Sequence, residues 1–266
     1  MSPAFWTWSA RDVVGVAGPD ALSYVHSQVS QDLLPLEVGE STWTLVLQPT
    51  GRVDALARVL RRAEHEVIID VDAGYGDALV ARLARFKIRV KAEISPLPWR
   101  CVAVRGVDRR AVAGGDIGGA SAVVSWWADP AAGVDLLGED PSPPGGIEEG
   151  SAAQLEEARV AAGWPAMGAE ITDATIPAEL GVAGVAVSFT KGCYPGQELV
   201  ERMDSRGTGA PRRLVALDAP AAARPGDALV VDGEDVGVLT SVAGQYALAL
   251  VRRSVPDEAI PGFRAR

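Results

Sequence analysis

The stretch Lys191-Gly192-Cys193-Tyr194-Pro195-Gly196-Gln197-Glu198 is the most informative part of the sequence. Two glycines and a proline within eight residues predict a sharply turned loop, and residues 197–203 are typical of a short helix. Cys193 is therefore expected just before a helix N-terminus, with Lys191 two residues away. A helix dipole and a nearby ammonium both favour a thiolate. Two interpretations stay open here: a reactive or ligand-contacting thiol, and a turn cysteine whose sulfur only packs.

Upstream of this loop, apolar patterns predict a mixed α+β layer. Leu22, Val25, Val29 and Leu33 are spaced three and four apart, which indicates one face of a helix. Strands are expected at residues 13–16, 43–47, 53–60, 66–71, 88–94, 100–104 and 122–127, and a second helix at 76–86. A strand, a helix and a strand within about thirty residues predict a βαβ-like unit.

Around residue 208 the pattern changes. Short apolar strands are expected at 213–217, 228–231, 236–240 and 246–251, separated by Gly, Pro and Asp turns. They predict a small antiparallel β-domain, a barrel. We place an α+β region at residues 1–207 and the barrel at 208–266. The Pro- and Gly-rich segment 138–150 is predicted to be a loop, followed by a helix that Ser151 and Gln154 cap.

Composition limits the class of protein. The chain has 266 residues, a formal net charge of −10 and a pI of about 4.8. Such an acidic chain makes nucleic acid an unlikely partner, because binding to phosphates needs a basic surface. Cys101 and Cys193 have unlike settings, a buried strand and a turn, which does not suggest a secreted disulfide framework. Without a signal peptide or an apolar run of about twenty residues, we expect a cytoplasmic protein and no membrane. His26 and His65 are too few and too separated to predict a metal site.

The signature loop and its flanks resemble one known family. Lys191–Glu198 is similar to the K-G-C-Y-x-G-Q-E motif of the YgfZ family of folate-binding, iron–sulfur-related proteins. The other similar segments are 18–21 (GPDA), 26–28 (HSQ), 32–33 (DL), 49–52 (PTGR), 159–165 (RVAAGWP), 176–179 (IPAE) and 247–251 (ALALV). The resemblance spans nearly the whole chain. It implies a three-lobed α+β fold, like that of the glycine-cleavage aminomethyltransferases, with ferredoxin-like layers around a central folate cavity and a small C-terminal β-barrel.

The resemblance also implies a function in assembling or repairing iron–sulfur clusters. Tetrahydrofolate, or a one-carbon derivative, would be the cofactor, and iron–sulfur enzymes or cluster-assembly proteins would be the partners. Cys193 at the cavity rim would be a redox-sensitive or transferring thiol, and Lys191 would support its thiolate or contact the folate anion. Each of these residues also has a structural alternative. Lys191 is a solvated lysine, or Tyr194 packs the turn instead of stacking on the folate. Gln197 and Glu198 cap the helix instead of contacting the folate.

Two carboxylates of the related aminomethyltransferases are missing by our alignment. Their adjacent Asp pair is read here as Asp54-Ala55, in which Asp54 remains a candidate folate contact, and their Glu in Arg-x-Glu-Ala-Gly is read as Ala161. Alanine neither accepts a proton nor holds a charge, which argues against aminomethyl or methyl transfer. Asp72 matches a strand-end position that faces folate in those enzymes, although a turn role is also open. A transferase, and a folate store or scaffold without thiol chemistry, remain the rival hypotheses.

Overall fold

Three five-stranded sheets make up the computed structural model, which describes residues 3–113, 116–205 and 210–265. The first sheet contains β2 (Arg11–Ala17), β3 (Ser41–Leu47), β4 (Val53–Ala63), β5 (Glu66–Asp72) and β6 (Glu93–Leu97), in the order β3-β4-β5-β2-β6. The second contains β1 (Phe5–Ser9), β7 (Arg100–Arg105), β8 (Ser121–Val124), β9 (Gly133–Gly138) and β10 (Glu148–Glu149), in the order β10-β1-β7-β9-β8. The third contains β11 (Arg212–Asp218), β12 (Ala228–Val231), β13 (Glu234–Ala243), β14 (Tyr246–Arg252) and β15 (Phe263–Arg264), in the order β12-β13-β14-β11-β15.

The helices are mostly short and lie around these sheets. They are α1 (Ala21–Gln28), α2 (Gly76–Phe86), α3 (Arg109–Ala113), α4 (Ala152–Ala161), α5 (Pro177–Leu180), α6 (Ala183–Ala186) and α7 (Gln197–Ser205), with 3-10 turns η1 (Trp126–Ala128) and η2 (Asp257–Ala259). The predicted cap of α4 is confirmed, because Ser151 and Gln154 exchange both hydrogen bonds of a capping box. In the described part of the chain, no helix combines the length and the apolar character needed to cross a membrane.

The predicted βαβ-like unit exists, with one correction to its second strand. β5 and β6 both pair antiparallel with β2, one on each side, so the two strands run parallel to each other across it. Helix α2 connects them, which is a split βαβ arrangement. The strand predicted at 88–94 begins only at Glu93, and Ile88 is 76% exposed. Residues 88–92 form an irregular connection, in which the alternation reflects only the packing of Val90 and Ala92 against the core.

The helix predicted over residues 22–33 is shorter than its apolar spacing suggested. It ends at Gln28, and Val29 has extended backbone and forms a β-bridge with Val46. Val29 and Leu33 are nevertheless fully buried in the same core as Val25. A loop that follows the helix back along the sheet buries residues at the same spacing, so the spacing alone did not reveal where the helix ends.

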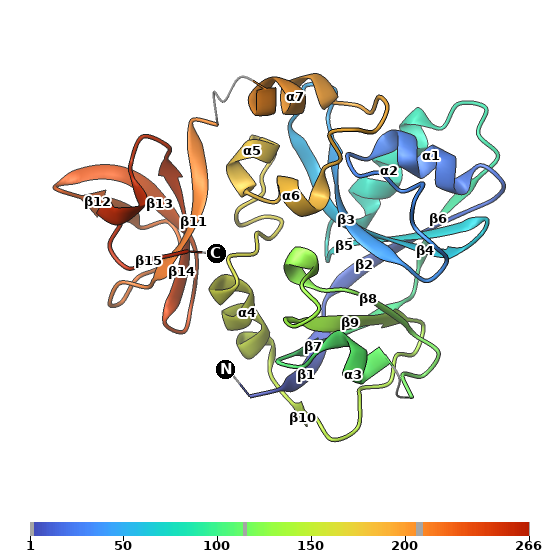
Figure 1. Cartoon of the computed structure of the whole chain (residues 1–266), viewed down its shortest axis with the longest axis horizontal. Coiled ribbons are helices and arrows are strands. Elements are labelled where there is room, and N and C mark those ends of the chain that lie inside the picture. The colour runs from blue at the N-terminus through green and yellow to red at the C-terminus, as the bar shows by residue number, and fades with distance from the viewer. Residues whose placement is uncertain (1–2, 114–115, 206–209, 266) are drawn as a thin grey trace.

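Separate apolar clusters join the first sheet to the second and α4 to the barrel. α1 and α2 cover one face of the first sheet. The opposite face meets the second sheet through a small apolar cluster formed by Val13, Leu60, Ile68, Cys101, Val123 and Leu137. In Figure 1 the third sheet lies on the left, with α4 and α5 between it and the other two sheets. Its antiparallel pairing confirms the predicted β-domain. The boundary expected at 207/208 falls within 206–209, outside the described residues.

Buried ion pairs cross both of these junctions. Arg58 on β4 is fully buried and donates to Asp70 on β5 at 2.9 and 3.0 Å and to Asp135 on the second sheet at 2.6 Å. Between α4 and the barrel, Arg159 donates to Glu170 at 3.0 Å and to Ser241 on β13 at 2.7 Å. Removing one partner of such a pair leaves an uncompensated buried charge, so these contacts fix the relative placement of the sheets.

Candidate functional site

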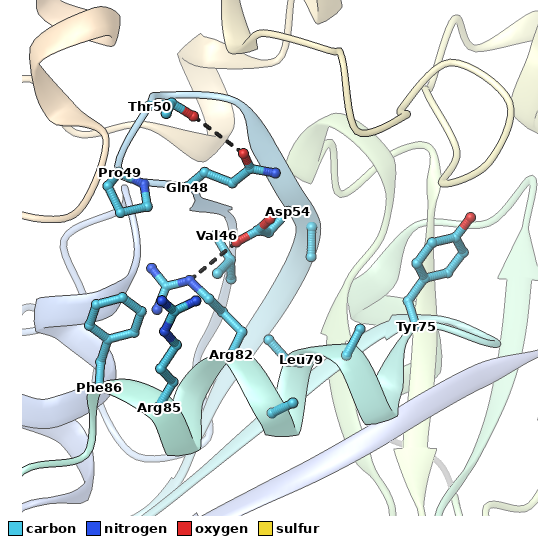
Figure 2. A pocket seen from close by; sticks show the side chains of 13 residues that line it. Val46, Gln48, Pro49, Thr50, Asp54, Tyr75, Leu79, Arg82, Arg85 and Phe86 are labelled. Carbon is cyan, nitrogen blue, oxygen red and sulfur yellow. Dashed lines mark hydrogen bonds and ion pairs between the residues drawn. The ribbon is translucent and has the colours of Figure 1, made fainter.

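A cavity lies between α2 and the turn that joins β3 to β4. Its volume is about 550 Å³, within the range of small-molecule sites. The lining residues are Val46, Gln48, Pro49, Thr50, Asp54, Ala55, Tyr75, Ala78, Leu79, Ala81, Arg82, Arg85 and Phe86. Figure 2 shows Tyr75 at one end of this α2 cavity and Phe86 with Arg85 at the other. The length of α2, 11 residues at 1.5 Å each, makes the cavity wall roughly 16 Å long.

An ion pair stands in the middle of the α2 cavity. Arg82 donates to Asp54 at 3.2 Å, and to the carbonyl of Leu47 at 2.9 Å. Burial lowers the pKa of Arg82 and Asp54 opposes that shift, so the guanidinium stays charged. The second carboxylate oxygen of Asp54 has no bonding partner among the described residues, and its side chain is 27% exposed. Asp54 therefore offers a free acceptor to a ligand.

The signature loop packs directly against the turn that lines the α2 cavity. Gly196 has a φ of +84°, and a Cβ there would stand 2.6 Å from the carbonyl oxygen of Gln48. A Cβ at Gly51 would stand 2.4 Å from the Cβ of Leu199 on α7. Both glycines are therefore required for this close approach. The turn is held between the loop on one side and the cavity on the other.

Cys193 is an exposed, free thiol on this loop. Gly196 is three positions further along the chain, so the Cα of Cys193 lies within about 11 Å of the glycine that touches the cavity turn. The cavity lining does not include it. Helix α7 begins at Gln197, four residues after the thiol, and the helix dipole acts mainly within its first turn. The dipole support expected for a thiolate is therefore weaker than the sequence suggested.

The structure places Lys191 away from the role expected for it. Its side chain is buried, and its ammonium donates to the carbonyl oxygens of His26, of Val29 at 2.7 Å and of Gln31 at 3.2 Å. An ammonium has three donors, and all three are used at the C-terminal end of α1. Burial lowers the pKa of Lys191 to about 8, with Asp32 opposing the shift. The ammonium of Lys191 is therefore not available to a folate carboxylate. Its hydrogen bonds instead hold the signature loop against the end of α1.

The other loop residues also have structural partners. Tyr194 is 7% exposed and packs in the core that contains Trp43 and Trp164, which leaves little ring surface for stacking on a ligand. Burial raises the pKa of Tyr194 to about 12. The side chain of Gln197 accepts a hydrogen bond from the backbone of Tyr194 at 3.3 Å, so it caps the turn. Glu198 is exposed on α7 and lies outside the α2 cavity lining.

Asp72 belongs to a second cavity, where the first two sheets meet α4 and the segment that follows it. It accepts hydrogen bonds from Arg11 and from the backbone of Met167, the latter at 2.9 Å. This tryptophan cavity has a volume of about 280 Å³. Its lining residues are Ser9, Ala10, Arg11, Trp43, Asp72, Arg105, Trp126, Asp135, Ala152, Leu155, Glu156, Arg159, Trp164, Pro165, Ala166 and Met167. Asp54 and Asp72, expected in one central site, therefore lie in separate cavities.

The two alanines that replace expected carboxylates are separated in the same way. Ala55 lines the α2 cavity, whereas Ala161 lines a cavity of about 250 Å³ between α4 and the barrel residues Gln245 and Tyr246. A carboxylate at 161 would stand beside Glu157 rather than beside Asp54. In this chain the two positions do not form one site.

The sequence reading missed the two arginines of the α2 cavity. Arg82 and Arg85 are three apart on α2, a spacing that puts both on one face of a helix. The spacing of Leu79, Leu83 and Phe86 predicts the helix, but nothing in that spacing marks the two arginines that line the cavity beside Leu79 and Phe86.

Comparison with known proteins agrees with this architecture. The solved structure of glycine cleavage system aminomethyltransferase T from Bartonella henselae superposes with a TM-score of 0.69, covering 94% of this chain and 79% of that one, at 19% identity. Residues 212–259 match the family description CAF17, C-terminal beta-barrel domain. The class is therefore a mixed α+β, aminomethyltransferase-like (GcvT-like) fold that ends in a β-barrel-like domain.

Two similar sequences extend over most of the chain. An uncharacterized protein of Haemophilus influenzae is 26% identical over 205 residues, which cover 76% of this chain and 69% of that protein. The mitochondrial iron-sulfur cluster assembly factor IBA57 homolog of Chaetomium globosum is 26% identical over 287 aligned positions, 96% of this chain and 64% of that protein. The chain is therefore similar in sequence to proteins of the CAF17/IBA57 (YgfZ) type and similar in fold to the GcvT aminomethyltransferases.

Proposed function

We propose that this protein binds a reduced folate in the α2 cavity and acts as an accessory factor in iron–sulfur cluster assembly or repair. The observation that carries the folate part is the α2 cavity itself, with its apolar walls, its free carboxylate oxygen on Asp54 and its two arginines. Folate has a flat ring with hydrogen-bond donors at one end and carboxylates at the other. Small-molecule sites are usually lined by apolar side chains with a few precisely placed polar groups, and the α2 cavity has this composition.

The described residues fit such a cofactor in one orientation. Tyr75, Leu79 and Val46 give the inner part of the α2 cavity an apolar surface, and Asp54 offers an acceptor to ring N–H groups. Phe86 and Arg85 at the opposite end suit the aminobenzoyl group and the carboxylates (Figure 2). When bound, the folate would supply one-carbon or redox chemistry. The residues of this chain would bind it, orient it and keep its ring out of water.

The cluster-assembly part rests on the sequence similarity and on the exposed thiol. The similar protein of Chaetomium globosum is named for iron–sulfur cluster assembly. Cys193 is the exposed thiol among the described residues, and its loop packs on the cavity turn through Gly196. A thiolate is the form that reacts and that ligates metal. We therefore assign contact with clients or clusters to Cys193, and binding of the cofactor to the α2 cavity.

Replacing Cys193 by serine tests this assignment in cells that lack their own copy of the protein. Because a hydroxyl is a far weaker nucleophile and metal ligand than a thiolate, we expect activities of iron–sulfur enzymes to fall at least about threefold compared with the wild type. The measurement is the activity of cluster-dependent enzymes in extracts, normalised to the level of each variant.

A matched control comes from the same loop. Thr190→Ala changes an exposed residue three positions earlier and should restore cluster-enzyme activity as fully as the wild type. If Cys193→Ser restores activity equally well, the thiol has no role. A folate-binding scaffold would then be the better description.

A further inference from the structure

A basic segment leaves the α2 cavity at its Phe86 end. Residues 82–91 read Arg-Leu-Ala-Arg-Phe-Lys-Ile-Arg-Val-Lys, five cations with no acidic residue, in a chain whose net charge is −10. Arg85 lines the cavity, and Lys87, Arg89 and Lys91 follow it along the connection to β6. A local positive field in an acidic protein attracts anions to that spot.

These four cations have exposed side chains without carboxylate partners. Arg85, Lys87, Arg89 and Lys91 are all exposed, and within the described residues none of their side chains takes part in an ion pair. Arg82, by contrast, is paired with Asp54 at 3.2 Å. The guanidinium carbon of Arg85 lies over the ring of Phe86, 5.8 Å from its centroid. The charges beyond Arg82 are therefore available to a ligand.

The backbone geometry of the segment also keeps it on the surface. Helix α2 ends at Phe86, and Arg89 has a φ of 58°, a conformation that turns the chain sharply. Ile88 is 76% exposed, whereas Val90 packs partly against the core, so the segment is anchored at Val90 while its cationic side chains stay outside. The sequence pattern had predicted a strand here, and the structure shows an exposed cationic connection that starts at the cavity.

We propose that Arg85 and the segment 87–91 bind a chain of carboxylates, the polyglutamate tail of the folate whose ring occupies the α2 cavity. This inference rests on the proposed function. The tail is preferred to an acidic peptide or a nucleic acid because the cations continue directly from the cavity end where the folate carboxylates are placed (Figure 2). Arg85 then meets the first glutamate, and Lys87, Arg89 and Lys91 meet the later ones.

The test compares tetrahydrofolate carrying one, three or five glutamates, titrated anaerobically by calorimetry against three proteins. They are the wild type, the triple variant Lys87→Gln/Arg89→Gln/Lys91→Gln, and a control with equal charge loss, Arg110→Gln/Arg224→Gln/Arg253→Gln, whose residues are exposed on α3 and the barrel. For the wild type we expect affinity to rise about 3- to 10-fold from one to five glutamates, as solvent-exposed ion pairs allow. The segment variant should lose this rise and keep monoglutamate affinity, and the control should keep both.

Each other result overturns the inference in a recognisable way. If wild-type affinity does not depend on tail length, the tail proposal is wrong while the folate site stands. If the segment variant keeps the rise, or the control loses it equally, the tail binds elsewhere or by net charge alone. If a short oligonucleotide displaces the pentaglutamate form as well as free pentaglutamate does, the segment is a general polyanion surface and the tail proposal is wrong. Absence of binding for every folate would instead contradict the proposed function itself.

Discussion

Replacing Arg58 by methionine should lower the free energy of unfolding by about 3–5 kcal/mol, the range for breaking a buried ion pair on one side. Arg58 is fully buried and bonds to Asp70, to Asp135 and to the carbonyl of Val124. Methionine fills most of the volume but leaves two carboxylates with fewer donors inside the protein. Denaturant unfolding of the two proteins, followed by circular dichroism, measures the difference.

A second arginine on the same strand provides the control. Arg62 pairs with Glu66 at 3.3 Å, and both side chains are about 40% exposed. Because exposed pairs contribute little, Arg62→Met should change the free energy of unfolding by less than about 1 kcal/mol. Equal effects at the two positions would mean that the ionic cluster does not hold the sheets together.

The effect of Arg58 should depend on pH in one direction. Burial alone would raise the pKa of Asp135, but Arg105 and Arg58 outweigh it and hold the pKa below its ordinary value. A carboxylate with a lowered folded pKa stabilises the fold above its unfolded pKa and loses that contribution as pH falls. The difference in free energy of unfolding between the wild type and Arg58→Met should therefore be largest at pH 7 and should shrink below about pH 4. A gap that widens in acid would contradict the assignment.

Replacing Lys191 by methionine should lower the free energy of unfolding by about 3 kcal/mol, because unpaired buried acceptors are costly. The three carbonyl oxygens that its ammonium satisfies lie at residues 26, 29 and 31, where α1 ends. The exposed Lys87→Met is the matched control, and it should change stability by no more than about 0.5 kcal/mol. Thermal and urea unfolding of both variants check the difference.

The pH dependence separates this structural role from a loss of packing. The pKa of Lys191 is lowered by burial to about 8, below the 10.5 of an ordinary lysine. Between these two values the unfolded chain binds more protons, so the wild type gains stability as pH rises. Lys191→Met lacks this gain, so the difference in free energy of unfolding between the two proteins should grow from pH 8 to pH 10. A gap that stays constant would mean that the folded pKa is not lowered.

Local signals in the sequence were enough for the elements that they specify by themselves. The bounds of α2, the capping box at Ser151 and the barrel strands agree with the structure because each depends on neighbouring residues. Cys101 was placed in a buried strand for the same reason, and it is 1% exposed. Its pKa is raised to about 12 by burial first and by Asp135 second, so it is an unreactive thiol.

The parts that failed depend on partners far away in the sequence. The sequence around Lys191 predicts a loop lysine, because nothing local shows that its ammonium contacts His26 on α1, 165 residues earlier. Arg58 was taken as one residue of a buried strand, although an arginine in such a strand requires carboxylates from other strands. Asp54 and Asp72 are 18 residues apart, yet the first sheet sends their side chains to different cavities. No pattern in the neighbouring sequence predicts any of these contacts.

Binding of tetrahydrofolate to a cavity-blocked variant tests the central claim most directly. Ala81 and Ala84 are both exposed on α2, but only Ala81 lines the α2 cavity. In anaerobic calorimetry we expect heat of binding for the wild type and for Ala84→Trp, and at least about a tenfold loss of affinity for Ala81→Trp, since an indole would occupy much of the ligand's space. Unchanged binding by Ala81→Trp, or no heat with the wild type, would contradict a folate site in this cavity.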